Sequence, residues 1–485
     1  MDLSISPKDI KEEMMHQLRA LNKAKLGPNF TPHKQVLDKL LEEIEEIDFQ
    51  SEANTDKKLQ KKHYVVITVE KILELAKDHN WGLSKRNGFI YLYNGAFWSP
   101  VEDDDLQIFL GKAAQKMGVN KFESKYHRFR DELVKQFMST AHIPAPEYHD
   151  SVVLINLENG TVEINPKNEE AVVLRNPEGS DFLTYQLPFA YNPHARAPLF
   201  QKYLNEVLPS ENLQRLMAEY IGYVFVRTST LKLEKALLLY GSGANGKSVF
   251  FEIVNALLGE TNVSNFTIKS LTDSNGYHRA KIANRLVNYA SEIDGQLETA
   301  IFKQLVSGEP VEARLPYKDP FTLTNYAKLI FNCNELPTDV EHTNAFFRRF
   351  LIVPFDVTIP EEDQDRQLAQ KIIVSELSGV FNWVLDGLKR LLNQKGFTHC
   401  KEVEEQIESF RRNSDSVLSF ISERSYQQSF TAYTSLKELY QSYRRFCEDE
   451  GYRACGSRTF SSRLTNAGFN SERKEYGKVF YLIQK

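Results

Sequence analysis

Cysteine is scarce in this sequence: four of the 485 residues are cysteines, and no two of them form a C-x-x-C pair. This count and spacing argue against a structural zinc site and a disulfide framework, and they favour a cytoplasmic, reducing environment. Long hydrophobic runs are also missing, and the first residues, MDLSISPKDIKEEMM, contain no apolar signal core. The sequence therefore predicts no association with a membrane.

An excess of positive charge is absent as well. The 60 Lys and Arg residues face 65 Asp and Glu residues, which gives a formal net charge of −5. Such a chain is not a polycation, so any contact with nucleic acid must come from local basic patches. The composition, 41% hydrophobic and 26% charged, is that of a globular protein, and the length allows about three or four domains.

A glycine-rich turn is the clearest motif that is present. The stretch KALLLYGSGANGKSVFFEIV fits G-x-x-x-x-G-K-[ST], with an apolar strand before the turn and an amphipathic helix after it. Backbone N–H groups and Lys247 would meet the phosphates of ATP, and the Ser248 hydroxyl would bind Mg²⁺. A coincidental glycine-rich turn is the alternative, which the flanking strand and helix disfavour. The residues expected to bind ATP are Gly241, Ser242, Gly243, Ala244, Asn245, Gly246, Lys247, Ser248 and Val249.

A second apolar strand, NRLVNYASEID, ends in carboxylates that suit ATP hydrolysis. We expect Glu292 to activate or orient the attacking water. Because Ser291 stands where an aspartate is usual, metal binding would depend on Ser248, waters and Asp294. A solvated glutamate at the end of a buried strand is the alternative for Glu292.

Two further polar features follow along the chain. The strand AKLIFNCNELP ends in Asn334, whose amide could position the attacking water beside the γ-phosphate. The segment FFRRFLIVPF carries Arg348 and Arg349 before another strand. An arginine supplied across a subunit interface, Arg349 or else Arg348, would stabilise charge in the transition state. The alternative for this pair is a salt bridge within the chain.

The order of these motifs resembles the superfamily 3 helicases of viruses, phages and plasmids. It is most similar to the C-terminal part of phage and plasmid primase-helicases, the branch that resembles the poxvirus primase-helicase. The resemblance covers roughly residues 150–485 and rests on FLTYQLPFAYNPHA, GSGANGKS, SEID, KQLVSGEPVEARLPYKDPFTLT, FNCNELP and FFRRFLIVPF. It implies an α/β fold: an AAA+-type P-loop ATPase domain with helical flanking segments and a C-terminal winged helix.

The resemblance also implies DNA-binding residues. Arg314 and Lys318 lie in a segment similar to the family's hairpin, which points basic residues into the channel of a ring; a solvated surface hairpin is the alternative. Residues 451–485 hold seven Lys or Arg against two Glu, and a basic helix with a basic wing suits DNA. A protein-binding winged helix is the alternative here. The cationic residues expected at DNA in the tail are Arg458, Arg463, Arg473, Lys474 and Lys478.

Six segments are expected along the chain. Residues 1–62 form a charged helical region and linker, either a solvated tether or a partner-binding helix. The others are a small mixed α/β region of unknown role (63–150), the family-specific region that precedes the helicase (151–215), the superfamily 3 AAA+ ATPase domain (216–360), a helical segment (361–425) and the winged helix (426–485).

The resemblance implies an ATP-dependent, hexameric, ring-forming DNA helicase that acts in replication of a mobile element, phage or plasmid. Its expected ligands are ATP, Mg²⁺, single-stranded DNA in the ring channel and a forked duplex. No D-x-D strand with a suitably placed histidine marks a primase, so a separate primase or polymerase is a possible partner. Two alternatives stay open: an origin-binding initiator whose ATP serves assembly, and a non-motor P-loop switch that binds proteins.

Overall fold

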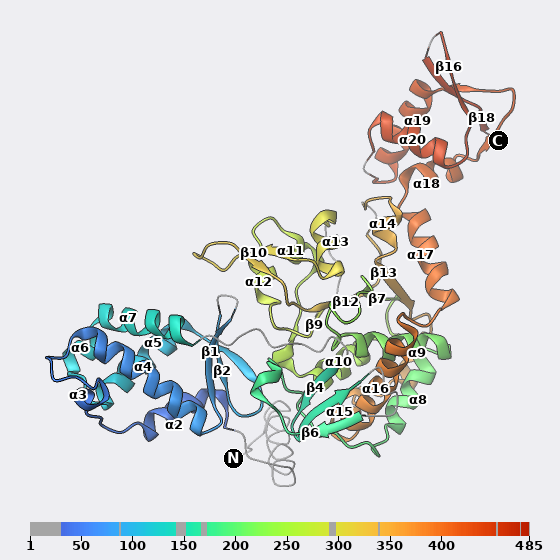
Figure 1. Ribbon diagram of the computed structural model, residues 1–485. Helices are drawn as coiled ribbons and strands as arrows, with labels where there is room; N and C mark the ends of the chain where they lie inside the picture. Colours follow the sequence, from blue (N-terminus) through green and yellow to red (C-terminus); the bar gives the residue numbers. More distant parts are fainter. Residues whose placement is uncertain are drawn as a thin grey trace, which may run out of the picture. The chain divides into compact units, whose positions relative to one another are not determined.

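The computed structural model describes residues 31–86, 89–141, 152–165, 172–290, 297–337, 340–452, 454–475 and 477–484 (Figure 1). The chain divides into two compact units. The first consists of Met1–Arg196 with Leu257–Gly259 and Leu377–Asn382, and the second holds the remaining residues. Within the described ranges, no helix combines the length and the apolar character needed to cross a bilayer.

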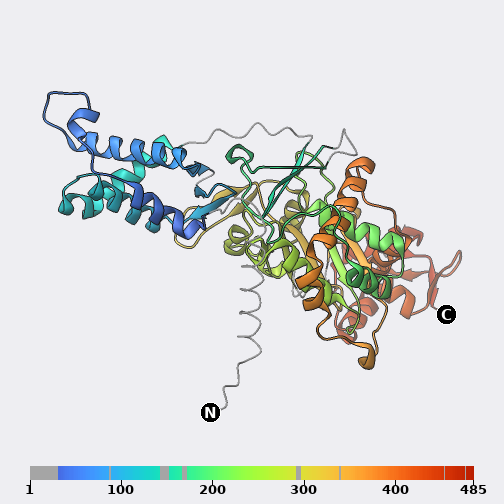
Figure 2. The same ribbon diagram turned by 90° about the horizontal axis from the view of Figure 1, so that it is seen from below.

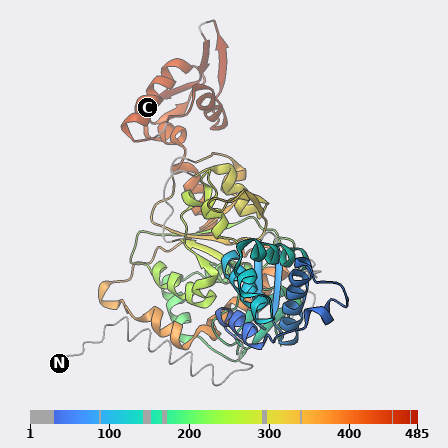
Figure 3. The ribbon, with the colours of Figure 1, turned by 90° about the vertical axis from the view of Figure 1, so that its left-hand side faces the viewer.

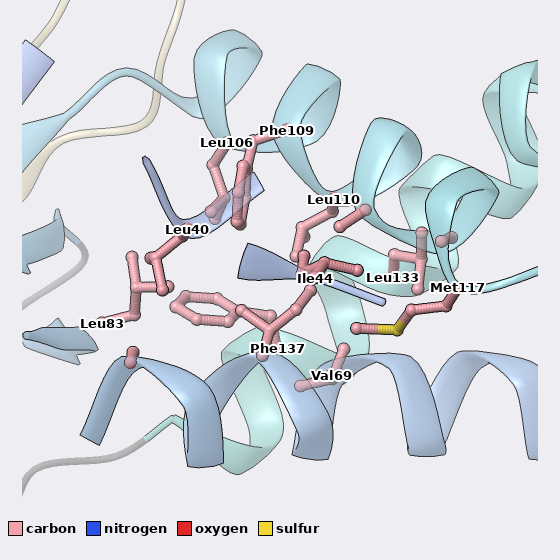
Figure 4. Close-up of a cluster of buried hydrophobic side chains, with 14 of the residues drawn as sticks. Leu40, Ile44, Val69, Leu83, Leu106, Phe109, Leu110, Met117, Leu133 and Phe137 are labelled. Carbon is pink, nitrogen blue, oxygen red and sulfur yellow. The ribbon is translucent and has the colours of Figure 1, made fainter. Parts of the chain in front are cut away.

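The N-terminal part of the first unit is a group of helices beside a small antiparallel sheet, coloured blue to teal in Figure 2. Figure 4 shows Leu40, Val69, Leu110 and Phe137 meeting in one buried apolar cluster, each from a different helix. Burial of these side chains holds the group together. The elements are α2 (His33–Glu43), α3 (Phe49–Glu52), α4 (Lys61–Asp78), β1 (Gly82–Arg86), β2 (Phe89–Tyr93), β3 (Trp98–Val101), α5 (Asp103–Lys116), α6 (Lys121–Lys125) and α7 (His127–Thr140).

A second antiparallel sheet completes the first unit, with the order β4 (Val153–Leu157), β5 (Gly160–Ile164) and β6 (Val172–Arg175). The Asn-Gly turn between β4 and β5 needs glycine, because a Cβ at Gly160 would lie 2.5 Å from the Arg175 carbonyl oxygen. The Arg175 guanidinium then joins the sheet to the 3-10 turn after it, through Glu163 at 3.0 Å and Asp181 at 2.8 Å.

The second unit is built on a five-stranded parallel sheet with the order β13-β7-β12-β9-β8. Its central strands read ALLLY, KLIFNC and FLIVP, the near-continuous apolar runs of strands that are buried on both faces. The α/β architecture with a parallel sheet agrees with the expectation from the sequence. The strands are β7 (Ala236–Tyr240), β8 (Val263–Ser264), β9 (Val287–Ala290), β12 (Lys328–Cys333) and β13 (Phe350–Pro354).

Helices surround this sheet, and two of them are locked together by a buried carboxylate. Glu219 of α9 is fully buried, and it accepts hydrogen bonds from the Arg390 Nε of α16 and the Thr398 N–H, both at 2.6 Å. The helices are α8 (Pro198–Val207), α9 (Glu211–Tyr223), α10 (Lys247–Leu258), α11 (Ile268–Thr272), α12 (Tyr277–Lys281), α13 (Thr299–Ser307), α14 (Asn344–Phe347), α15 (Leu368–Ser375), α16 (Leu377–Gln394) and α17 (Lys401–Asn413).

The C-terminal elements of the second unit form a compact group, red in Figure 3. Phe420, Tyr443 and Phe460 pack in its core. The helix–helix–hairpin order that the sequence predicts for the tail is present, and β15, β17 and β16 pair in that order. The elements are α18 (Ser416–Glu423), β14 (Tyr426–Gln428), β15 (Thr434–Ser435), α19 (Leu436–Asp449), α20 (Ser457–Asn466), β16 (Ser471–Lys474), β17 (Gly477–Phe480) and β18 (Leu482–Gln484).

Candidate functional site

The glycine-rich loop leaves the C-terminal end of β7 and enters α10 at Lys247, as the sequence predicts. The backbone is in the positive-φ region at Gly243 (113°), Ala244 (48°) and Gly246 (86°). Glycine is also required sterically, because a Cβ at Gly241 would lie 2.5 Å from the Phe355 carbonyl oxygen. The loop is therefore a tight turn that leads directly into the start of a helix.

Lys247 is held inside this loop. Its Nζ donates to the Gly241 carbonyl oxygen at 2.6 Å and to Asn245 Oδ1 at 3.0 Å, and burial lowers the pKa of its ammonium group. The Asn245 side chain is itself fixed, because its Nδ2 donates to the Phe355 carbonyl oxygen at 2.9 Å. Ser248, the next residue, is exposed in the first turn of α10. A buried ammonium, an exposed hydroxyl and a helix N-terminus together suit a polyphosphate.

Helix α8 packs against the glycine-rich loop, a contact that the sequence patterns did not reveal. The Tyr203 hydroxyl donates to the Gly246 carbonyl oxygen at 2.8 Å, and burial raises the pKa of Tyr203 well above its ordinary value. A Cβ at Gly246 would lie 2.6 Å from Val207 Cγ1 of the same helix. Glu376 fixes α8 in turn, since its carboxylate accepts from the Leu199 and Phe200 N–H groups at 3.0 and 2.9 Å.

Asn334 emerges beside the loop. It directly follows β12, whose Cys333 pairs with Tyr240 and accepts from the Gly241 N–H at 3.2 Å. The Asn334 side chain is exposed, whereas Asn332 is buried and accepts from the Tyr289 hydroxyl at 2.9 Å. Of these two asparagines, Asn334 is the one that can reach a ligand at this edge of the sheet.

The carboxylates proposed for water activation and metal binding follow β9, which ends at Ala290. Ser291, Glu292 and Asp294 lie outside the described residues. Phe331 is the register partner of Ala290, so β9 ends at the same edge of the sheet as β7 and β12. Elsewhere in the described ranges, no three His, Cys, Asp or Glu side chains form a group that could hold a metal.

The two arginines before β13 have different surroundings. The Arg349 side chain is 9% exposed, donates to the Ala345 carbonyl oxygen and to Ser307 Oγ at 3.1 Å, and lies 3.7 Å from the Glu234 carboxylate. The Arg348 side chain is 63% exposed and lies 3.3 Å from the same carboxylate. In the single chain, Arg348 therefore presents the accessible guanidinium of the pair.

Both arginines lie at the opposite edge of the sheet from the loop. The Arg349 carbonyl oxygen accepts from the N–H of Ala236, the first residue of β7, whereas Gly241 follows the last residue. A five-residue strand separates these points by about 16 Å at 3.3 Å per residue. Neither arginine can therefore reach the glycine-rich loop of its own chain without a large rearrangement.

The predicted basic hairpin is present. Strands β10 (Val311–Ala313) and β11 (Phe321–Leu323) pair in antiparallel fashion, and their connection projects from the elements around it (Figure 1). Arg314 and Lys318 are exposed in this connection, and Arg314 Nε donates to the Lys318 carbonyl oxygen at 3.0 Å. Tyr317 is fully exposed between them with a φ of 61°, a feature that the sequence reasoning missed although Pro316 beside it marks a turn.

The tail cations divide into two groups. Arg458 and Arg473 are exposed. Three others contact neighbours: Arg463 Nη1 donates to Asp415 at 3.2 Å, Lys474 Nζ lies 3.6 Å from the Tyr433 ring centre, and Lys478 Nζ donates to Ser461 at 2.9 Å. Arg463 is partly buried by its ion pair, so a contact with DNA would require that pair to open.

An open groove of about 700 Å³ lies between α19, the start of α20 and β17. Glu438 is its one carboxylate, and this group is engaged by the Ser435 hydroxyl at 2.8 Å. Lys437 and Arg444 add to the cations of the tail; their spacing on one helix face could have identified them in the sequence. The lining residues are Tyr433, Ser435, Leu436, Lys437, Glu438, Tyr440, Gln441, Arg444, Ser457, Gly477 and Lys478.

Three family models match parts of the chain. They are the D5 N terminal like family over residues 69–209, a family of unknown function (DUF5906) over residues 239–349, and the Poxvirus D5 protein-like family over residues 412–481.

Among curated proteins, the chain is similar to Putative helicase L207/L206 of Acanthamoeba polyphaga mimivirus. The two are 26% identical over 239 residues, which are 47% of this chain and 24% of the viral protein. The chain thus spans about a quarter of that relative's length.

Among solved structures, it is similar to two apo structures of the NrS-1 C terminal region, each 12% identical. The match to the A form has a TM-score of 0.46 and covers 85% of this chain and 98% of the NrS-1 chain. The apo structure of residues 305–718 has a TM-score of 0.45 and covers 87% of this chain and 99% of its own.

Proposed function

The D5-type family matches and the viral relative confirm the resemblance to phage and viral primase-helicases, and on that premise we propose that this chain is an ATP-dependent DNA helicase acting in replication. One observation carries the proposal. The loop that holds Lys247 and Ser248 leaves β7 next to Asn334, at the edge where three parallel strands end. A ligand in this position would meet a cation, a hydroxyl and an amide together.

The strand order supports an AAA+-type ATPase. Strand β12 lies between the loop strand β7 and the strand β9 that leads to Glu292. In an ATPase of this order Asn334 would lie between the phosphate loop and the Glu292 carboxylate, which suits an amide that positions the attacking water. Glu292 would then accept or orient the proton of that water.

The residues present fit Mg²⁺ bound together with ATP. Magnesium in such sites takes few protein ligands and keeps waters and substrate phosphates, so the exposed Ser248 hydroxyl is a sufficient anchor, with Asp294 as a further ligand. When bound, the ion would supply positive charge that neutralises the charge developing during hydrolysis. Lys247 would hold the phosphates, and Gly246 lets the loop pack closely against Val207 and Tyr203 of α8.

Hydrolysis would need a second copy of the chain. Because Arg348 lies at the far edge of its own sheet with an exposed guanidinium, it can reach a nucleotide only on a neighbour. A head-to-tail contact that repeats in this way generates a ring when its rotation closes. A hexamer is the assembly we propose, as the resemblance implies.

The exposed hairpin supplies the contact with DNA. Arg314 and Lys318 would bind successive phosphates of one strand without regard to sequence, and Tyr317 between them offers a ring on which a base can stack. Movement of this hairpin with the state of the nucleotide would draw the strand through the ring. The C-terminal elements, proposed here as a winged helix, would bind DNA through Arg458, Arg473 and the groove beside α19.

That groove also favours a second candidate, an origin-binding initiator in which ATP serves assembly. Cations from α19 and β17 around one cavity suit a duplex backbone as well as a fork. Tight binding of one duplex sequence, without unwinding, would favour this role.

The rate of ATP hydrolysis with and without single-stranded DNA tests the proposal. We expect strong stimulation by DNA in the wild type, no hydrolysis in Lys247→Ala, and basal hydrolysis without stimulation in Arg314→Ala with Lys318→Ala. Lys371→Ala is a matched control, because Lys371 is an exposed cation that pairs with Asp365 elsewhere in the same unit. Hydrolysis that ignores every nucleic acid would point to a protein-binding switch instead.

A further inference from the structure

The surface formed by α6 and the start of α7 combines exposed aromatic rings with exposed cations. Phe122 is 82% exposed and Tyr126, four residues later, is 43% exposed. Residues 121–130, KFESKYHRFR, hold four Lys or Arg and one Glu. Lys121, Lys125 and Arg128, which precede, separate and follow the two aromatic residues in the sequence, are also exposed. Nothing in the ATPase mechanism uses this surface.

The rings are carried on a firmly packed base. Ser124 and Phe129, which lie among the exposed positions, are fully buried. Arg130 Nε donates to the Ser124 carbonyl oxygen at 3.1 Å. Helix α5 approaches so closely that a Cβ at Gly111 would lie 2.6 Å from Arg130 Nε. Asn120 caps α6 by accepting from the Phe122 N–H at 2.9 Å. The surface is therefore pre-organised rather than a loose loop.

The two aromatic residues are four positions apart across the junction of the two helices. Phe122 lies in α6, and Tyr126, in extended backbone with a φ of −71° and a ψ of 127°, is the C-cap of α6 and the N-cap of α7. The Tyr126 ring is steadied by an edge contact with His127, with ring centres 4.8 Å apart. Burying such rings in the unit would be favourable, so their exposure next to cations indicates a ligand with flat apolar faces and negative charge.

We propose that this surface binds single-stranded nucleic acid, with bases stacked on Phe122 and Tyr126 and phosphates held by Lys121, Lys125 and Arg128. Stacking on aromatic side chains combined with a basic track is the general chemistry of sequence-tolerant single-strand binding. The surface lies in the segment that matches the D5 N terminal like family, for which the sequence offered no role. It is at the end of the helical group remote from β1 and β2 (Figure 1).

Binding at this surface requires neither ATP nor unwinding, so it is tested in a Lys247→Ala background without nucleotide. Phe122→Ala and Tyr126→Ala should each weaken binding of a labelled oligo-dT by about fivefold or more. A loss of about fivefold corresponds to the low end of the free energy that one stacked base contributes. Tyr126→Phe should bind as the parent does. Ile108→Ala is the matched control, because Ile108 is an exposed apolar residue of the same unit whose side chain has no ring.

The cations are tested through the salt dependence of binding. The double change Lys121→Ala with Lys125→Ala should reduce the slope of log K against log salt by up to about 1.4, because each phosphate contact on a single strand contributes about 0.7. Lys135→Ala, an exposed lysine further along α7, should leave the slope unchanged. Oligo-rU in parallel with oligo-dT decides between RNA and DNA as the natural strand.

Photo-crosslinking with a bromodeoxyuridine oligonucleotide places the strand directly. Adducts on Phe122 or Tyr126 are the expected result. Absence of adducts in residues 119–130, together with unchanged affinity in both alanine variants, would overturn the proposal. It would also be overturned if Phe122→Ala reduced self-association in sedimentation while the crosslinks and affinity stayed the same, because the surface would then join copies of the chain.

Discussion

Replacing Arg348 by alanine should abolish most ATP hydrolysis while leaving the fold intact. The side chain is 63% exposed, and its ion pair with Glu234 is a surface pair, so its loss should cost no more than about 1 kcal/mol of unfolding free energy. If the guanidinium acts on a neighbour's nucleotide, its removal should lower kcat on the order of a thousandfold. Stability and activity would thus separate.

Arg349→Ala should behave in the opposite way. Its side chain is 9% exposed, and it contacts Ala345, Ser307 and Glu234. Its removal leaves buried polar groups with fewer partners, so we expect a loss of about 2–4 kcal/mol in urea unfolding. Lower hydrolysis in this variant should follow the fraction of unfolded chain.

Mixing two inactive variants tests the trans arrangement. An Arg348→Ala subunit keeps its nucleotide loop, and a Lys247→Ala subunit keeps its arginine. Random assembly of equal amounts should restore activity at about a quarter of the interfaces, those in which an intact loop faces an intact arginine. The trans arrangement would be wrong if the mixture stays inactive although both variants are folded and associated, or if Arg348→Ala hydrolyses ATP like the wild type.

Three further outcomes are expected. Gly246→Ala should lose about 2 kcal/mol or more of stability in thermal unfolding and should bind nucleotide more weakly. The added Cβ would lie 2.6 Å from Val207, and the φ at this position is 86°. Nucleotide affinity equal to that of the wild type would contradict this. Arg390→Met should cost about 3–5 kcal/mol in urea unfolding, since it leaves the buried Glu219 carboxylate without that cation; a cost below 1 kcal/mol would show that the ion pair is not essential. Burial lowers the pKa of Lys328 to about 8 in the folded chain from its ordinary 10.5, so the unfolded chain binds more protons between these values. Stability relative to Lys328→Met should therefore rise from about pH 8 towards pH 10, and a flat difference across this window would refute it.

Local patterns in the sequence were enough to locate the glycine-rich loop and the end of β12. Each depends on a strand, a turn and a helix that are adjacent in the chain, and the structure has these elements where the patterns indicate them. The elements of the tail could be predicted for the same reason, because its helices and hairpin follow one another directly in the sequence. The six segment boundaries stay predictions.

Contacts between residues that lie far apart in the sequence could not be predicted from it. Tyr203 supports Gly246 across 43 residues, and no periodic pattern links the two. Which arginine of the pair is buried depends on Ser307 and Glu234, which lie 42 and about 115 positions away. The sequence could identify the pair, but the choice between its members needed the packed chain.

The proposed helicase couples ATP hydrolysis to the separation of DNA strands. Strand separation on a forked duplex, with ATP and Mg²⁺ and with Lys247→Ala as the control, measures this coupling directly. We expect unwinding by the wild type that disappears in Lys247→Ala and falls strongly in Arg348→Ala. ATP hydrolysis by the wild type without any unwinding, under conditions in which it binds the fork, would contradict it.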